Sequence, residues 1–225
     1  MIKQEDLPLM VDLYELAMAQ AYWAEGMADT AVFSLFFREL PEHRNFVLAC
    51  GQRHIAELIG QLRFTEDYIE RLRQLNRFQP EFLDWLKGFR FSGNIRAVEE
   101  GTPLFPQEPI LEVTAPIAEA QLLESLIMNY VHLESVLASK AVRLTFAADG
   151  KPVVDFGMRR MHGLDAAHRG VRAYRLAGLT GTSNVLAGLD YGMDVSGTMA
   201  HSFVQAYPDE MEAFKVYARL YPGTT

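Results

Sequence analysis

Apolar residues recur at helical intervals through most of the first 90 positions. Between positions 7 and 25 the apolar side chains lie three or four residues apart, and Gly26 follows them, so the spacing predicts a helix that ends there. The same spacing predicts further helices over 52–62, 65–76 and 80–86. The aromatic-rich run 31–38 is short enough to be a strand. The first part of the chain is therefore predicted to mix helices with strands.

The pattern changes to alternation and turn residues between positions 89 and 113. Three prolines separate short runs there, which predicts a small β-rich module. The tripeptide Thr114-Ala115-Pro116 then predicts the start of one long helix that reaches about Leu144. Proline suits the first turn of a helix, and a broad apolar stripe follows it.

The last third of the chain alternates between strand and helix patterns. The pattern predicts a strand over 152–157, helices over 164–177 and 185–191, a strand over 194–198 and a helix over 209–220. This alternation is typical of parallel α/β architecture, in which the loops after the strands build the site. Those loops hold Arg159-Arg160, Thr182-Ser183-Asn184 and His201-Ser202. We therefore predict that three polar loops converge on one face.

Composition and charge narrow the class of protein. A chain of 225 residues with 49% hydrophobic content can bury the core of one large domain or two modest ones. The net charge of -8 argues against nucleic acid and acidic membranes as partners. The single cysteine, Cys50, lies in an apolar run, which predicts a buried thiol and a reducing compartment. Neither a signal peptide nor a membrane-spanning run is recognisable, so we expect a cytoplasmic protein.

His201 is the first candidate for chemistry. Small and hydroxyl-bearing residues surround it, namely Gly197, Thr198, Ala200 and Ser202, and they leave room for a bulky reactant beside the imidazole. Such a site suits nucleophilic or acid–base chemistry. The alternative is a hydrogen-bonded loop histidine that has no chemical role.

Four cations are candidates for binding a phosphate. Arg38 and Arg44 bracket a turn at Pro41, where they either hold a phosphate or form a solvated edge. Lys140 and Arg143 lie in the last turns of the predicted long helix. There they either interact favourably with the negative end of the helix dipole or bind a phosphate.

His54 and Glu57 have the spacing of metal ligands on one helical face. No second histidine follows at the interval that a zinc-binding helix needs. We therefore interpret both as surface polar residues and predict no metal site.

Three segments of the last third are similar to the signatures of nicotinate phosphoribosyltransferases, and they lie at 156–160, 181–188 and 196–202. Their order and spacing match that family, and segments at 12–18, 36–38 and 119–143 extend the similarity over nearly the whole chain. The resemblance implies an N-terminal α+β domain over 1–145. The first part of a type II phosphoribosyltransferase α/β barrel would follow over 146–225, so the barrel is incomplete in this chain.

The resemblance also implies a reaction of NAD salvage. A phosphoribosyl group would pass from phosphoribosyl pyrophosphate to the ring nitrogen of nicotinate, giving nicotinate mononucleotide and pyrophosphate while ATP is hydrolysed. By this analogy ATP phosphorylates His201 transiently, which agrees with the nucleophilicity of a neutral imidazole. Asp155 is then the candidate to orient the other ring nitrogen. Mg²⁺ would accompany ATP and phosphoribosyl pyrophosphate, without a tightly bound cofactor.

By this analogy, three residues contact nicotinate. Tyr14 would lie against the ring and reach into the site of a neighbouring subunit in a homodimer. Arg159 would take the carboxylate, with Ser202 as a close polar contact. An aromatic face with a guanidinium fork suits a flat pyridine carboxylate and selects it over neutral nicotinamide. The remaining candidate substrate contacts are Thr182, Ser183, Asn184, Arg38, Lys140 and Arg143.

One departure from the family concerns length, because family members are roughly twice as long. The missing half would carry the later strands of the barrel, and we expect that a separate chain could supply it. An open parallel sheet leaves an edge strand and an apolar face uncovered. Two alternatives remain: an inactive remnant that acts as an interaction module, and a related phosphoribosyltransferase that uses quinolinate or nicotinamide.

Overall fold

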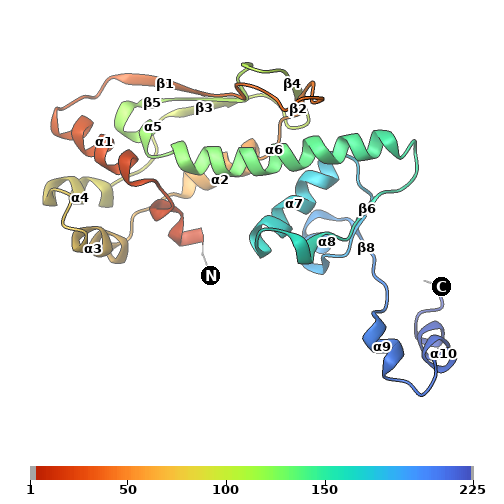
Figure 1. Ribbon diagram of the computed structural model, residues 1–225. Helices are drawn as coiled ribbons and strands as arrows, with labels where there is room; N and C mark the ends of the chain where they lie inside the picture. The colour runs from red at the N-terminus through yellow and green to blue at the C-terminus, as the bar shows by residue number, and fades with distance from the viewer. Residues whose placement is uncertain (1–3, 224–225) are drawn as a thin grey trace.

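The computed structural model describes residues 4–223 (Figure 1). Its helices are α1 (Leu13–Ala24), α2 (Gln52–Gln61), α3 (Glu66–Gln74), α4 (Pro80–Lys87), α5 (Ile117–Gln121), α6 (Glu124–Ala147), α7 (Leu164–Leu176), α8 (Val185–Tyr191), α9 (His201–Gln205) and α10 (Glu210–Leu220). Two 3-10 helices are η1 (Gln4–Leu9) and η2 (Met158–Arg160). Its strands are β1 (Thr30–Leu35), β2 (Val47–Leu48), β3 (Asn94–Ala97), β4 (Pro103–Leu104), β5 (Leu111–Pro116), β6 (Val154–Asp155), β7 (Gly181–Thr182) and β8 (Asp194–Val195).

The helices that the apolar spacing predicts are largely confirmed. Those expected over 52–62, 65–76, 80–86, 164–177, 185–191 and 209–220 are α2, α3, α4, α7, α8 and α10. The helix expected over 7–25 divides into the turn η1 and the helix α1. The strand expected over 31–38 is β1, which ends at Leu35.

The prediction of one long helix from Thr114 is wrong in two respects. Residues 114–116 end strand β5, in which buried and half-buried positions alternate, and the helical run that follows is broken between α5 and α6. At the start of the second helix, the fully buried carboxylate of Glu15 accepts the Ser125 N–H at 3.2 Å. A carboxylate from α1 thus satisfies an amide that the first turn of a helix leaves without a partner.

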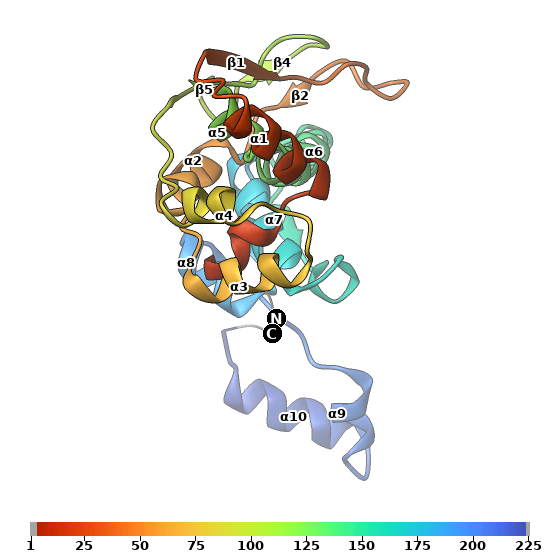
Figure 2. The same cartoon turned by 90° about the vertical axis from the view of Figure 1, so that its left-hand side faces the viewer.

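The first sheet has the order β1-β5-β3 and is antiparallel throughout. Its central strand β5 pairs with both neighbours, so that Val113 lies opposite Phe33 on one side and Ile95 on the other. Helices α1, α5 and α6 lie along one face of this sheet (Figures 1 and 2). The segment 89–113 is therefore not a module of its own, because its strands pair with β1 and β2 from earlier in the chain.

The second sheet has the order β6-β7-β8 and is parallel, with β7 in the middle. Helices α7 and α8 connect its strands, which confirms the α/β class expected for this part of the chain. The sheet is open, so the described residues form no closed barrel. The strands expected over 152–157 and 194–198 are only two residues long, as is the central strand β7.

Helix α6 joins the two halves of the molecule (Figure 1). Its first turns contribute Leu126, Ile127 and Val131 to the hydrophobic cluster under the first sheet. Further along, Ala138 and Ala141 belong to a second cluster with α7 and α8. The division of the chain at position 145 into two domains stays a prediction.

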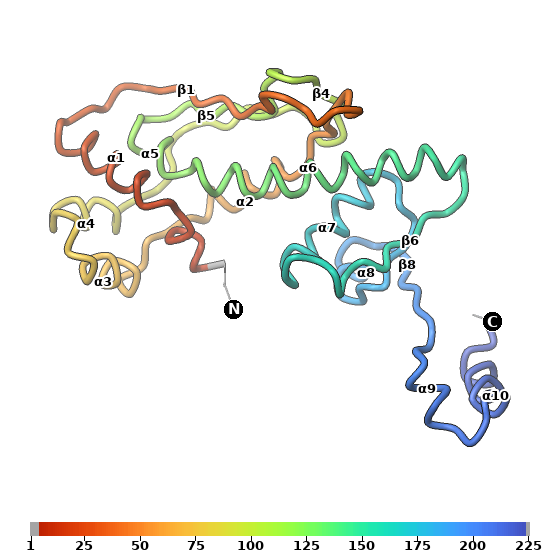
Figure 3. Tube along the Cα trace, viewed as in Figure 1, coloured from red at the N-terminus to blue at the C-terminus, as the bar shows by residue number. Residues whose placement is uncertain are grey.

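Helices α9 and α10 pack against each other and lie apart from the rest of the chain (Figures 2 and 3). Aromatic rings join them, because the ring centroid of Phe203 lies 5.1 Å from that of Tyr207 and 6.0 Å from that of Tyr217. Asp209 caps α10 by accepting the Glu212 N–H at 2.9 Å. Within residues 4–223, no helix combines the length and apolar composition that crossing a bilayer requires.

Candidate active site

The three parallel strands end at the same edge of their sheet, and the carboxylate of Asp155 lies at that edge. Its Oδ1 accepts the Gly157 N–H at 2.8 Å, and its Oδ2 accepts the hydroxyl of Thr182 at 3.0 Å. The same residue's backbone carbonyl accepts the Ser183 N–H at 2.8 Å. Asp155 therefore ties the turn after β6 to the loop after β7.

The loop after β7 is organised by its own polar side chains. Thr182 is fully buried, and its hydroxyl oxygen accepts the Asn184 N–H at 3.1 Å while donating to Asp155. Asn184 is also buried and caps α8, because its Oδ1 accepts the Ala187 N–H at 3.2 Å. Of the three polar residues predicted here, Ser183 is the most accessible. Substrate contact by any of the three stays a prediction.

Arg159 lies in the short turn η2, directly after the strand that carries Asp155. Its side chain is exposed, and the described residues form no ion pair with it. The turn is closed by the Arg160 N–H, which donates to the Gly157 carbonyl at 2.8 Å. The turn thus presents two exposed guanidinium groups, those of Arg159 and Arg160, after strand β6.

His201 and Ser202 are placed differently from the other strand-end residues. Both are exposed in the first turn of α9, which is separated from β8 by an extended stretch (Figure 3). No hydrogen bond joins Asp155 to His201 among residues 4–223, and the expectation that Asp155 orients His201 stays a prediction. Both carboxylate oxygens of Asp155 already have donors in Gly157 and Thr182. The structure therefore brings two of the three predicted loops together and leaves the histidine loop apart.

Tyr14 lies on α1, which packs against α4 and α5 rather than the second sheet (Figures 1 and 2). The residue is 46% exposed. A hydrogen bond to Glu124, with smaller contributions from burial and nearby carboxylates, raises the pKa of the Tyr14 phenol to about 12. The phenol thus keeps its proton at neutral pH. Within one copy of the chain, Tyr14 does not meet Arg159 or His201.

The predicted cations lie around the start of β2 and the end of α6. Arg143 stacks over the ring of Phe46, with its Cζ 4.3 Å from the ring centroid, and its Nη2 donates to the Phe46 carbonyl at 2.9 Å. Burial, together with the nearby charge of Arg44, lowers the pKa of Arg143. Arg143 therefore has a packing role in this structure. Arg38, in the loop after β1, and Lys140, on α6, are exposed.

A buried charged network between α6 and α7 was not predicted from the sequence. The carboxylate of Glu134 is fully buried, and Arg172 donates to it from Nη1 at 2.6 Å and to Glu100 from Nη2. His54 Nδ1 lies 3.5 Å from Glu134 Oε1, so His54 is not the surface residue that we expected. Its helical neighbour Glu57 is exposed as predicted. Burial raises the pKa of Glu134, but His54 and Arg172 outweigh it and hold that pKa below its usual value.

The signal for this network was present in the sequence. Glu134 stands on the apolar stripe of its helix, in register with the buried residues Val131 and Ala138. A carboxylate at such a position needs a buried cation, and Arg172 on the facing helix is that partner.

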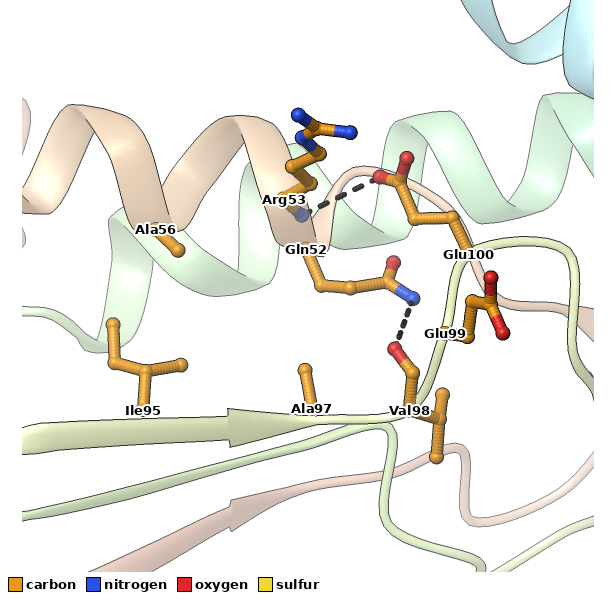
Figure 4. A pocket seen from close by; sticks show the side chains of 8 residues that line it. All are labelled: Gln52, Arg53, Ala56, Ile95, Ala97, Val98, Glu99 and Glu100. Carbon is orange, nitrogen blue, oxygen red and sulfur yellow. Dashed lines mark hydrogen bonds between the residues drawn. The ribbon is translucent and has the colours of Figure 1, made fainter.

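A cavity of about 340 Å³ lies between α2 and β3, away from the strand ends (Figure 4). Gln52 reaches across it and donates from Nε2 to the Val98 carbonyl at 3.1 Å. At one end, Glu100 accepts the Arg53 N–H at 3.4 Å. None of the predicted site residues lines this cavity. In the described part of the chain, no group of three or more His, Cys, Asp or Glu side chains is arranged to hold a metal.

Two family models cover most of the chain. The N-terminal domain of nicotinate phosphoribosyltransferase matches residues 9–132, and the nicotinate phosphoribosyltransferase family matches residues 152–216. The chain belongs to the nicotinate phosphoribosyltransferase family. The resemblance of its strand-end segments to that family is thereby confirmed.

Relatives in this family are similar over nearly the whole chain. The chain is 53% identical to nicotinate phosphoribosyltransferase pncB2 of Mycobacterium tuberculosis over 99% of its length, and 38% identical to nicotinate phosphoribosyltransferase of Bacillus subtilis over 96%. These matches cover 48% and 44% of the two relatives. The chain thus spans about half the length of the curated relatives that it matches.

Solved structures agree with the fold. The crystal structure of human nicotinic acid phosphoribosyltransferase superposes with a TM-score of 0.80 at 35% identity, covering 87% of this chain and 40% of that one. A nicotinate-nucleotide pyrophosphorylase from Pyrococcus furiosus superposes with a TM-score of 0.77 at 22% identity, over 96% of this chain and 49% of that one. These neighbours confirm an α/β fold that corresponds to the N-terminal part of the family's chain.

Proposed function

We propose that this chain carries the nicotinate-recognising and histidine-bearing part of a nicotinate phosphoribosyltransferase. The reaction transfers a phosphoribosyl group from phosphoribosyl pyrophosphate to the ring nitrogen of nicotinate and releases pyrophosphate, as a step of NAD salvage. The observation that carries this proposal is the family match over 152–216, which includes the turn of Arg159, the loop of Ser183 and His201. The proposed location is the cytoplasm, in agreement with the free, buried thiol of Cys50.

Arg159 is proposed to bind the carboxylate of nicotinate. Its guanidinium is exposed beside the strand ends and forms no ion pair with the described residues, so its donors are available to a substrate. A guanidinium pairs with a carboxylate through two parallel hydrogen bonds, whereas the amide of nicotinamide offers only one acceptor oxygen and no charge. This contact therefore favours nicotinate over nicotinamide.

His201 is proposed to accept a phosphoryl group from ATP. A ring nitrogen attacks the γ-phosphorus, the bond to the bridging oxygen breaks, and ADP leaves; water later releases the phosphate from the histidine. The exposure of His201 supports this role, because a nucleotide can reach the ring. Mg²⁺ enters the proposal only as the companion of ATP and phosphoribosyl pyrophosphate, with no described residue assigned to it.

Tyr14 is proposed to contact nicotinate from a second copy of the chain. Helix α1 lies away from the second sheet within one copy, so the ring of Tyr14 meets Arg159 only across a subunit interface (Figure 1). A homodimer with a shared site supplies that interface. Since the relatives are about twice as long, a second polypeptide that provides the rest of the barrel belongs to the same proposal.

The test measures nicotinate mononucleotide and acid-labile protein phosphate. The chain is assayed alone, and then with the C-terminal half of the Mycobacterium tuberculosis relative, in the presence of nicotinate, phosphoribosyl pyrophosphate, ATP and Mg²⁺. His201→Ala should abolish protein phosphate and the ATP-dependent part of turnover. The matched control is His132→Ala, an exposed histidine on α6, which should leave both unchanged.

Substrate competition tests the specificity. Arg159→Ala should lose the preference for nicotinate over nicotinamide, and an unchanged preference refutes the role given to Arg159. Turnover of quinolinate or nicotinamide in place of nicotinate would identify a related phosphoribosyltransferase. A folded chain that makes no product and takes up no phosphate, with or without the added half, would support the interaction module instead.

A further inference from the structure

The buried hydroxyl of Thr182 stands at the centre of the hydrogen bonds that join the two substrate loops. It donates to Asp155 Oδ2 at 3.0 Å and accepts the Asn184 N–H at 3.1 Å. Its own backbone carbonyl accepts the Ser196 N–H at 2.9 Å, so the residue also fixes the start of the segment after β8. Thr182 is fully buried, so protein atoms enclose its hydroxyl in this structure.

Asp155 connects Thr182 to the turn that carries Arg159. Its Oδ1 accepts the Gly157 N–H at 2.8 Å, two residues before the arginine. The approach is close, because a Cβ added at Gly157 would lie 3.0 Å from that same oxygen. A side chain at position 157 would therefore displace the carboxylate by a few tenths of an ångström. The direction in which the turn leaves the sheet depends on where the carboxylate is held.

We infer that Thr182 is a positioning residue, which fixes the Asp155 carboxylate and through it the turn that presents Arg159 to the carboxylate of nicotinate. Without its hydroxyl, Asp155 Oδ2 and the Asn184 N–H both lose a partner in a buried environment. The turn then loses its fixed orientation, although Arg159 itself is unchanged. The inference rests on the proposed function for the identity of the ligand, and on the hydrogen bonds alone for the positioning.

Three variants test the positioning directly. Thr182→Val keeps the shape and β-branching of the side chain but removes the hydroxyl, whereas Thr182→Ser keeps the hydroxyl. Thr180→Val is the matched control, because the exposed Thr180 hydroxyl donates only to the Val153 carbonyl at 3.2 Å. Amide hydrogen exchange is followed at Gly157, and circular dichroism verifies that each variant is folded.

Thr182→Val should speed exchange at the Gly157 amide at least about tenfold, since a hydrogen bond to a carboxylate is worth more than about 1.4 kcal/mol. Thr182→Ser and Thr180→Val should exchange like the parent chain. Gly157→Ala should reproduce the effect from the other side, because its methyl group presses on the same carboxylate oxygen. Exchange at Gly157 that is unchanged in a folded Thr182→Val variant overturns the inference, whatever the activity.

Kinetics then separate positioning from a general loss of structure. Thr182→Val should raise the KM for nicotinate by about 10- to 100-fold, the size of effect that a misplacement of about 1 Å produces. The KM for ATP should not change, and Thr182→Ser should restore the nicotinate KM. Equal losses for both substrates contradict a role specific to Arg159. If no variant and no parent chain makes product while Gly157 still exchanges faster in Thr182→Val, the proposed function fails and the positioning role stands.

Discussion

The strongest quantitative prediction concerns the ion pair of Arg172 with Glu134. Changing Arg172 to methionine keeps a long apolar side chain between α6 and α7 but removes both guanidinium contacts. The Glu134 carboxylate is fully buried, and it is left with His54 at 3.5 Å and the thiol of Cys50 at 3.7 Å. Breaking one partner of a buried pair in this way costs about 3–5 kcal/mol in general.

The magnitude also follows from the charge that remains. A buried carboxylate without a cation takes up a proton, and protonating a glutamate of ordinary pKa, about 4.3, costs about 3.7 kcal/mol at pH 7 and about 1 kcal/mol at pH 5. The parent chain behaves oppositely, because the pKa of Glu134 is lowered in the folded state. The stabilisation that ionised Glu134 gives the folded chain is complete above the pKa of an unfolded glutamate. It disappears only as the pH falls through the lower pKa of Glu134 in the folded state. The difference between variant and parent should therefore grow with pH.

Urea unfolding followed by circular dichroism at pH 5, 6 and 7 measures this difference. Arg172→Met should lower the free energy of unfolding by about 3–4 kcal/mol at pH 7 and by about 1 kcal/mol at pH 5. Arg175→Met, on the exposed side of α7, is the control and should change stability by less than about 0.5 kcal/mol. A loss below about 1 kcal/mol at pH 7, or one that does not shrink toward pH 5, refutes this reasoning.

Three further predictions concern local structure. Asn184→Ala removes the cap of α8 and should lower the free energy of unfolding by about 1 kcal/mol in urea titration. Gly93→Ala should destabilise the chain in the same assay, because its Cβ would lie 2.4 Å from that of Ala115, whereas Gly60→Ala, in open space on α2, should be neutral or stabilising by up to about 1 kcal/mol. Burial and the nearby Glu134 raise the pKa of the Cys50 thiol, so a thiol reagent at pH 8 should label Cys50 at the rate of unfolding, and immediate labelling would contradict its burial.

The local spacing of apolar residues predicted most helices, because a helix that is buried on one side carries apolar residues at helical intervals on that side. Helices α3 and α7 have charged outer faces and buried apolar residues at helical intervals, and both were predicted within a few residues. The segment 114–116 was assigned to a helix because proline often occupies the first turn of a helix. Its strand conformation depends instead on pairing with Thr30–Val32, more than 80 positions earlier, which no local window contains.

The sequence predicted which residues follow the strands at the candidate site, but it did not predict how their side chains are arranged. Parallel topology placed the residues after β6 and β7 at one edge, as the alternating pattern indicated. The pattern does not reveal which hydroxyl points outward. Thr182 and Asn184 are directed into the fold, while Ser183 between them is more accessible. The Glu134 network was missed because its partner Arg172 lies 38 positions later in the sequence, on another helix.

The separation of Asp155 from His201 changes what the histidine requires. An imidazole that acts as a nucleophile needs one nitrogen free to attack and an acceptor for the proton on the other. In this structure Asp155 accepts hydrogen bonds from Gly157 and Thr182, which hold its own loop, and His201 lies on a separate helix. We therefore expect a second copy, a completing polypeptide or the bound substrates to supply the acceptor for His201, unless α9 approaches Asp155 when these bind. Helix α9 lies apart from the sheet, where any of these can reach it (Figure 2). We therefore expect a substitution of Asp155 to weaken nicotinate binding more than it reduces the phosphorylation of His201.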